Sequence, residues 1–260
     1  MLFPFVKYQG TGNDFVIMDN RDKQFPIGNH EAVAQICHRN FGIGADGFIL
    51  IENDPKADFY MRYFNADGHE GSLCGNGSRC AIHYAKSLGL TNETLTFSAA
   101  DGLHHAQCIG DSIALELHDV SSWEMRYEAL FLNTGSPHHV VFVADIDAVD
   151  VATQGPLIAH GAPYFSDGTN VNFVQVLDEN TMAIRTYERG VEAETLSCGT
   201  GVTAAALAVH IMQKTEKTTL SFETRGGNLQ VSFNPRDNAY ESIVLQGPTA
   251  AVYTGNWELV

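Results

Sequence analysis

The sequence predicts an α+β fold built from two pseudo-symmetric units, each with strands wrapped around one helix. Two observations lead to this prediction. Segments of the first half recur in the second half, in the same order and at nearly one offset. Within each half, strand-like segments surround a helix-like segment that follows a Cys-Gly-x-Gly motif, at Cys74 and at Cys198.

The internal repeat covers about half of the chain. Its offset is 123 residues at first and slips to 124 and 125 further on. A few short matches arise by chance, but an ordered set at nearly one offset indicates two copies of one fold unit. The matches are Gly12-Asn13 on Gly135-Ser136, Gly47 on Asn170, Asn65 on Glu188, Cys74-Gly75 on Cys198-Gly199, and residues 94–97 on 219–222.

Three segments predict helices. Residues 30–40 (HEAVAQICHRN) are the first, and residues 78–88 are the second, because apolar side chains recur there at helical spacing before Gly89. Residues 202–212 are apolar on nearly every face, which is typical of a helix buried on all sides. Alternating or continuous apolar residues with β-branched and aromatic members predict strands at 113–117, 183–187, 229–233 and 242–245.

The two copies divide near residue 118. We expect residues 1–117 to form the first unit and residues 118–246 the second. The final segment, 247–260, comes after the last matched strand of the second copy. We expect it to return to the first unit and complete that unit.

Composition excludes several classes of protein. The 260 residues carry 15 basic and 31 acidic side chains, a net charge of -16, so the basic face of a nucleic-acid-binding protein is not expected. Hydrophobic residues make up 44%, enough for a buried core. Because no apolar run approaches the 18 or more residues of a membrane span, no membrane association is expected.

The five cysteines indicate free thiols in a reducing, cytoplasmic environment, because their number is odd and no signal peptide is visible. Cys74 and Cys80 lack the CxxC spacing and the nearby histidine pair of a zinc site, so no metal is expected. No dinucleotide-binding glycine pattern or phosphate-binding loop is present either, so no cofactor is expected.

A cysteine at the start of a helix has unusual chemistry. The first N–H groups of a helix have no partner inside it and, with the helix dipole, favour an anion. A thiolate there is stabilised, and glycines let a ligand approach the backbone closely. For Cys37, Cys80 and Cys108, which lie in helix-like or strand-like runs, we favour a buried structural role.

Cys74 and Cys198 fit a different role, since each lies in a glycine-flanked loop at equivalent positions of the repeat. If the two helix starts face one cleft, a bound carboxylate has a thiol on each side. One thiolate can then remove a proton from one face of a carbon while the other thiol protonates the opposite face. Two helix starts aimed at the carboxylate would stabilise the carbanion.

The chain resembles the diaminopimelate epimerase family in six segments that span nearly its whole length: GTGNDFVIMD, FGIGADG, FNADGHEGSLCGNGSRC, GSPHH, GTNVNF and YERGVEAETLSCGTGVTAAA. The resemblance implies a homodimer of chains with two units, each a mixed, mostly antiparallel β-barrel around a central α-helix. It places the active site in the cleft between the units. It implies epimerisation of LL-diaminopimelate to meso-diaminopimelate without pyridoxal phosphate, in the synthesis of lysine and peptidoglycan precursors.

The resemblance also assigns roles to residues. Cys74 and Cys198 become the acid/base pair, and His138 and Glu188 tune their pKa values. The α-carboxylate is expected at Gly75, Asn76, Gly199 and Thr200. The distal amino-acid end is expected at Asn13, Asn65, Asn170, Glu188 and Arg189.

Two positions depart from the family pattern. Gly47 and Ser136 stand where the family often has glutamine and asparagine. These differences change the contacts expected with the distal amino-acid end of the substrate. Two alternatives remain open. One is another pyridoxal-phosphate-independent racemase of the same fold, such as a proline racemase-like enzyme. The other is a redox or ligand-binding protein in which Cys74 and Cys198 form a reversible disulfide.

Overall fold

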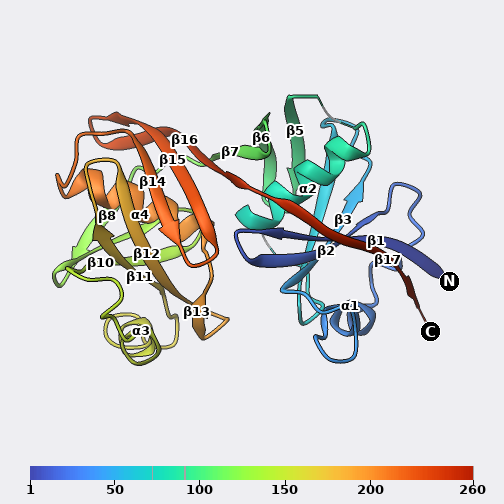
Figure 1. Ribbon diagram of the computed structural model, residues 1–260, viewed down its shortest axis with the longest axis horizontal. Helices are drawn as coiled ribbons and strands as arrows, with labels where there is room; N and C mark the ends of the chain where they lie inside the picture. Colours follow the sequence, from blue (N-terminus) through green and yellow to red (C-terminus); the bar gives the residue numbers. More distant parts are fainter. Residues whose placement is uncertain (72, 91, 260) are drawn as a thin grey trace. The chain divides into compact units, whose positions relative to one another are not determined.

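A computed structural model describes residues 1–71, 73–90 and 92–259. The chain divides into two compact units, Met1–Leu115 with Gly247–Val260, and Glu116–Gln246 (Figure 1). These boundaries fall inside strands β7 (Ser112–Leu117) and β16 (Ala239–Pro248). Val260 lies outside the described residues.

The first unit is a mixed sheet with two helices. Going from β1 to β7, neighbouring strands pair as antiparallel, parallel, antiparallel, parallel, antiparallel and antiparallel, and β17 pairs antiparallel with β1 beside both chain ends (Figure 1). Its elements are β1 (Leu2–Gly10), β2 (Asn13–Asp19), α1 (His30–Cys37), β3 (Gly47–Glu52), β4 (Phe59–Asn65), α2 (Gly75–Ser87), β5 (Thr94–Ala99), β6 (Gly102–Ile109) and β17 (Ala250–Glu258).

The second unit repeats this order of pairings. Strands β9 to β12, β14, β15 and β16 pair as antiparallel, parallel, antiparallel, parallel, antiparallel and antiparallel, with β8 and β13 added. Its elements are β8 (Trp123–Arg126), β9 (Ala129–Asn133), β10 (Pro137–Phe142), α3 (Val151–Ala159), β11 (Asn170–Val176), β12 (Thr181–Glu188), β13 (Ala193–Thr195), α4 (Gly199–Ile211), β14 (Thr219–Thr224) and β15 (Gly227–Arg236).

The repeat found in the sequence coincides with strand register. Phe15 lies opposite Gly47 in the parallel pair β2–β3, and His138 lies opposite Asn170 in the parallel pair β10–β11. Both residues of the second pair follow those of the first by 123 positions. The turn before β10 therefore corresponds to the turn before β2, which carries the Asn13 motif.

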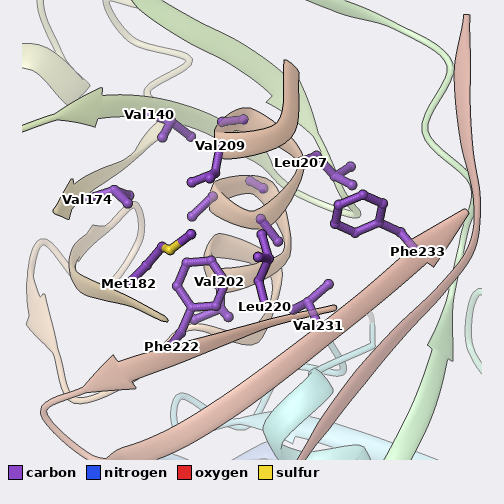
Figure 2. Close-up of a cluster of buried hydrophobic side chains, with 14 of the residues drawn as sticks. Val140, Val174, Met182, Val202, Leu207, Val209, Leu220, Phe222, Val231 and Phe233 are labelled. Atoms are coloured by element: carbon purple, nitrogen blue, oxygen red, sulfur yellow. The ribbon is translucent and has the colours of Figure 1, made fainter. Parts of the chain in front are cut away.

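Helix α4 forms the middle of the core of the second unit. Its residues 202–209 are almost completely buried, and side chains from several strands point at it, including Val140 of β10, Met182 of β12 and Phe222 of β14 (Figure 2). Burying each Leu, Val or Phe side chain stabilises the fold by about 1.5–3 kcal/mol. This packing fixes the position at which α4 begins, and therefore the position of Cys198.

The structure corrects several predicted element bounds. Helix α1 ends at Cys37 and not at residue 40, because His38 is extended (φ -66°, ψ 120°). Helices α2 and α4 each begin three residues earlier than predicted, at Gly75 and Gly199. The four predicted strands extend by one to three residues at one or both ends. Helix α3, with Gly155 and Pro156 inside it, was not predicted at all.

Two general features concern the described part of the chain. None of its helices is long and apolar enough to cross a membrane. All five cysteines are free, and Cys37, Cys80 and Cys108 are buried. Burial raises the pKa of Cys37 to about 12 and raises the pKa of Cys80 and Cys108 as well, so these three thiols stay protonated at neutral pH.

Candidate active site

Cys74 and Cys198 each occupy the N-cap position of a helix. Cys74 precedes α2 with extended backbone (φ -109°, ψ 113°), and Cys198 precedes α4 in nearly the same conformation (φ -128°, ψ 111°). Neither thiol caps its helix with a side-chain hydrogen bond, and both residues are half-buried. The first-turn N–H groups have no partner within the helix, so each unit presents a thiol beside potential anion-binding donors.

In the first unit, Asn13 connects the start of α2 with the loop before β3. Its Nδ2 donates to Asp46 Oδ2 at 2.6 Å. Its Oδ1 accepts from Asn76 Nδ2 at 3.2 Å and from Cys74 Sγ at 3.8 Å. Arg39 holds Asp46 from the other side at 2.7 Å. The structure thus brings together three predicted site residues, Asn13, Cys74 and Asn76.

Asn65 is the last residue of β4 and lies opposite Gly47 in β3. It is exposed, and its Nδ2 lies close to Gly71, where an added Cβ would be 3.2 Å away. Among the described residues, no hydrogen bond joins its side chain to Cys74 or Asn13. Its role in holding substrate stays a prediction.

The space beside Gly47 is filled by an aromatic ring. A Cβ added at Gly47 would lie 2.6 Å from Tyr63 Cε2 and 2.9 Å from the Phe64 carbonyl oxygen. The same ring covers Gly71, where an added Cβ would lie 2.9 Å from Tyr63 Cδ1. The departure at Gly47 is therefore more than a missing contact, because Tyr63 occupies the space that a larger side chain would need.

We expect Gly47→Gln to lower the free energy of unfolding by about 1–3 kcal/mol, because it overpacks a buried position against Tyr63 and the backbone. The matched control Gly28→Gln, which meets no atom within 4 Å, should change it by less than about 0.5 kcal/mol. Urea denaturation measures both. Adding Tyr63→Ala should recover part of the loss, and equal stability of the two glutamine variants would contradict the expectation.

In the second unit, Cys198 lies at the end of a directed chain of hydrogen bonds. Thr186 Oγ1 donates to Asn172 Oδ1 at 3.0 Å, so Asn172 Nδ2 faces His138 Nδ1, also at 3.0 Å. His138 Nε2 therefore carries the ring proton and donates to Thr200 Oγ1 at 3.0 Å. Thr200 Oγ1 lies 3.5 Å from Cys198 Sγ.

The pKa of Cys198 is controlled by opposing groups. Burial raises it well above the ordinary value, and the Glu188 carboxylate raises it further. The Thr200 hydroxyl and the Gly201 N–H oppose this increase, because both favour the negatively charged sulfur. Glu188 Oε1 also accepts from Thr195 Oγ1 at 2.7 Å, which fixes the carboxylate near the thiol. The predicted neighbours Glu188 and Thr200 are therefore both at Cys198.

Asn170 and Arg189 lie together at the ends of β11 and β12. Asn170 Oδ1 accepts from the Arg189 backbone N–H at 2.9 Å, and Asn170 Nδ2 donates to the Pro137 carbonyl at 3.0 Å. The exposed Arg189 guanidinium donates to the Asp167 carbonyl at 2.8 Å. It lines a cavity of about 400 Å³, together with Arg126 and other residues of this unit.

His138 is fully buried and stays neutral. Burial, aided by the Arg189 charge, lowers its pKa to about 3, and burial with the Arg126 charge lowers that of His139 to about 4. A neutral His138 is consistent with its position as acceptor from Asn172 and donor to Thr200. Thr200 Oγ1 lies between His138 Nε2 and Cys198 Sγ.

These lowered pKa values predict a pH-dependent stability. Both imidazoles would bind a proton below about pH 6.5 in the unfolded chain but remain neutral in the folded one. Their contribution to stability is therefore complete above pH 6.5 and decreases as the pH falls toward 4 and 3. The decrease is at most about 1.4 kcal/mol per pH unit for each histidine.

The variant His138→Asn removes one of these two contributions. In urea denaturation between pH 7.5 and 4.5, we expect its free energy of unfolding to fall less steeply with decreasing pH than that of the unsubstituted chain. Parallel slopes for the two proteins would contradict the neutral state of His138.

Sequence reasoning missed three residues that contact the predicted site residues or their partners: Asp46, Asn172 and Thr186. Asp46 and Asn172 lie within segments already recognised, FGIGADG and GTNVNF, but no pattern assigned them a partner. Asn172, which is fully buried in β11 between Val171 and Phe173, carried the clearest signal. Within the described residues, no group of three or more His, Cys, Asp or Glu side chains could hold a metal ion.

Solved structures define the class to which this fold belongs. A PhzF-family phenazine biosynthesis protein from Bacillus anthracis matches with a TM-score of 0.82 at 15% identity, covering 100% of both chains. A hydroxyproline epimerase from Agrobacterium vitis matches with a TM-score of 0.71 at 14% identity, covering 98% of this chain and 92% of that one. The chain therefore has the fold of these PhzF-like and epimerase proteins.

The sequence places the chain more narrowly within that class. The diaminopimelate epimerase family model matches residues 5–117 and 130–252. A diaminopimelate epimerase from Flavobacterium psychrophilum is 46% identical over 248 residues, covering 95% of this chain and 97% of that protein. The chain belongs to the diaminopimelate epimerase family, and the resemblance noted in its sequence is confirmed.

Proposed function

We propose that this chain is an isomerase that converts LL-diaminopimelate to meso-diaminopimelate by a cofactor-independent mechanism with two thiols. The relatives that carry this name cover nearly the whole chain. The observation that carries the mechanism is the repeated helix start. Two cysteines, 124 residues apart, each take the N-cap position of a 13-residue helix in nearly the same extended conformation.

In this mechanism the two units close on one substrate, with their helix starts directed at its α-carbon. Gly75 and Asn76 on one side, and Gly199 and Thr200 on the other, bind the α-carboxylate through backbone N–H groups. One cysteine, as thiolate, removes the α-proton, and the other, as thiol, delivers a proton to the opposite face. The carboxylate-bound donors stabilise the negative charge that develops between the two steps.

Contacts with the distal amino-acid end of diaminopimelate, which does not react, provide substrate specificity. Arg189 forms a bidentate pair with the distal carboxylate, and its guanidinium has donors for this besides the Nη1 group that donates to the Asp167 carbonyl. Asn13, Asn65 and Asn170 supply amide groups, and Glu188 accepts from the distal ammonium. Glu188 also keeps Cys198 protonated until substrate binds, and His138 holds the Thr200 hydroxyl against the Cys198 sulfur.

The same proposal extends to fold and setting. We infer that each unit closes into a mixed, mostly antiparallel barrel around its long helix, α2 or α4. We further propose a homodimer that works in the cytoplasm, where its free thiols stay reduced. Sedimentation equilibrium of the purified chain tests the dimer, and a monomer at micromolar concentration would contradict it.

A substrate comparison tests the function. The reduced protein, without added cofactor, is incubated separately with LL-diaminopimelate, L-proline and trans-4-hydroxy-L-proline, and chiral chromatography follows the products. We expect meso-diaminopimelate alone to form at an appreciable rate. Turnover of a proline substrate without turnover of diaminopimelate would replace this function with that of another racemase of the same fold.

A further inference from the structure

Arg79 is a buried cation behind the start of α2. Its side chain is fully buried, and no ion pair joins it to a carboxylate within residues 1–71, 73–90 and 92–259. Among the described residues, none forms a hydrogen bond with its Nε or Nη1. An unpaired buried charge is costly, so its retention here requires an explanation beyond packing.

The two bonds that Arg79 makes lead into the site. Its Nη2 donates to Asn76 Oδ1 at 2.9 Å and to Thr11 Oγ1 at 3.3 Å. Because a guanidinium can only donate, the oxygen of Asn76 must face it and the Asn76 amide nitrogen must face Asn13. At the other end, the Asp46 carboxylate can only accept, so it fixes Asn13 in the matching orientation.

Gly10 lies close to Asn76, Cys80 and the Arg79 guanidinium. A Cβ added there would lie 3.5 Å from Arg79 Nη2, 3.3 Å from Cys80 Sγ and 3.2 Å from the Asn76 carbonyl oxygen. Burial lowers the pKa of Arg79, and negative charge on the Cys80 and Cys74 thiols opposes this decrease. The acidic groups that affect the pKa of Arg79 are therefore the thiols of Cys80 and Cys74.

The second unit has no such cation at the equivalent position. Thr203 takes the place of Arg79 in the repeat, and its hydroxyl donates to the Gly199 carbonyl within α4 at 2.9 Å. Near Cys198 the structure instead has the neutral His138 and the anionic Glu188. The two halves of the site therefore differ in charge although they share a backbone plan.

We propose that Arg79 is a positioning residue that orients Asn76 and Asn13, and that its buried positive charge stabilises the thiolate of Cys74. The proposal deepens the proposed function, because it concerns one of the two thiols assigned to catalysis. It also accounts for an unpaired buried guanidinium, which gains its counterion when Cys74 loses a proton.

Other titratable groups around Arg79 and Cys74 do not supply this charge. Cys80 on α2 is fully buried with a raised pKa, and Tyr8 on β1 has its pKa raised to about 12, chiefly by burial. Asp46, across Asn13, is negative and paired with Arg39. From β1 and β2, Lys7 and Asp14 pair with each other at 2.7 Å.

The test is a titration of Cys74 without substrate, in the full chain carrying Cys198→Ala. The rate of Cys74 alkylation by iodoacetamide is measured from pH 5 to 10 by peptide mass spectrometry. The chain that keeps Arg79 is compared with the variants Arg79→Gln and Arg79→Lys. The neutral glutamine should slow Cys74 alkylation at pH 7 by at least about tenfold, which corresponds to a shift of one pKa unit. The lysine should remain within about threefold, and the control Thr203→Val should leave the profile unchanged.

Folding of each variant is read in the same experiment, because the buried Cys37 and Cys80 are labelled only if the first unit opens. An Arg79→Gln protein that keeps both unlabelled and reacts at Cys74 at the original rate overturns the proposal. If Cys80 is labelled in the Arg79→Gln variant, the first unit has opened and the Arg79→Lys variant provides the test. A folded Arg79→Lys variant in which Cys74 is alkylated tenfold more slowly overturns the proposal. Because no substrate is present, neither of these alkylation results bears on the epimerase assignment. That assignment is tested separately, by the turnover of diaminopimelate.

Discussion

Alanine at either Cys74 or Cys198 is expected to lower the rate of epimerisation by at least about 10²–10⁴-fold, the range associated with one general acid or base. Each thiol is needed in every turnover, because one removes the proton and the other replaces it. Neither loss can be compensated by the remaining thiol, since it faces only one side of the α-carbon in this mechanism. The conversion of LL- to meso-diaminopimelate measures the effect.

The control for this experiment is Cys108→Ala, since Cys108 lies in β6, is buried and has a raised pKa. We expect this variant to keep its activity within about threefold, a change small beside the general acid–base range. Full activity of Cys74→Ala or of Cys198→Ala, with the protein folded, would contradict the two-thiol mechanism.

Gly201→Ala is expected to have the second largest effect. A Cβ at this position would lie 2.4 Å from Asn172 Oδ1, and Asn172 is fully buried and held by Thr186 and His138. The asparagine cannot move away without breaking the chain of hydrogen bonds that orients the Thr200 hydroxyl. A displacement of about 1 Å in a catalytic group can reduce the rate about 10²-fold, and we expect a loss of this size.

The matched variant is Gly77→Ala, at the equivalent position of the repeat. The atoms nearest to its Cβ would be Ile49 Cδ1 at 3.2 Å and the Phe15 ring at 3.3 Å, which are apolar ends that can shift slightly. We expect its activity to fall by less than about tenfold, well short of the loss from a misplaced catalytic group. Steady-state rates for both variants check the difference, and equal losses would show that the Asn172 contact is not what requires glycine at 201.

The sequence-based prediction placed the starts of α2 and α4 three residues too late. Glycine has a low helix propensity, so the glycines of both motifs predicted loops. In the structure they are helical because packing overrides propensity, with Gly77 close to Phe15 and Gly201 close to Asn172. Helix α3 was missed for a related reason. Gly155 and Pro156 interrupt its pattern, yet Gly155 is what lets the helix lie against the Tyr187 ring, 2.6 Å from an added Cβ.

The candidate site was predictable where its chemistry is repeated in the sequence. The two Cys-Gly-x-Gly motifs stand in register, so self-comparison located both thiols and the turns that carry Asn13 and His138. The supporting contacts were not predictable, because they join elements that are far apart in the sequence. Asp46 meets Asn13 across 33 residues, and Asn172 meets His138 across 34. A single polar residue in a buried strand or helix, such as Asn172 or Arg79, is the only local sign of such a contact.

Deuterium incorporation during the first few per cent of turnover tests the two-thiol mechanism most directly. LL-diaminopimelate is incubated in D₂O with the reduced protein, and NMR follows the α-position of both epimers. Because different thiols remove and return the proton, we predict that the meso product carries deuterium while unreacted LL-diaminopimelate keeps its proton. Meso product that retains the original proton, or deuterium that enters unreacted substrate as fast as product, would contradict the assignment of Cys74 and Cys198 to opposite faces.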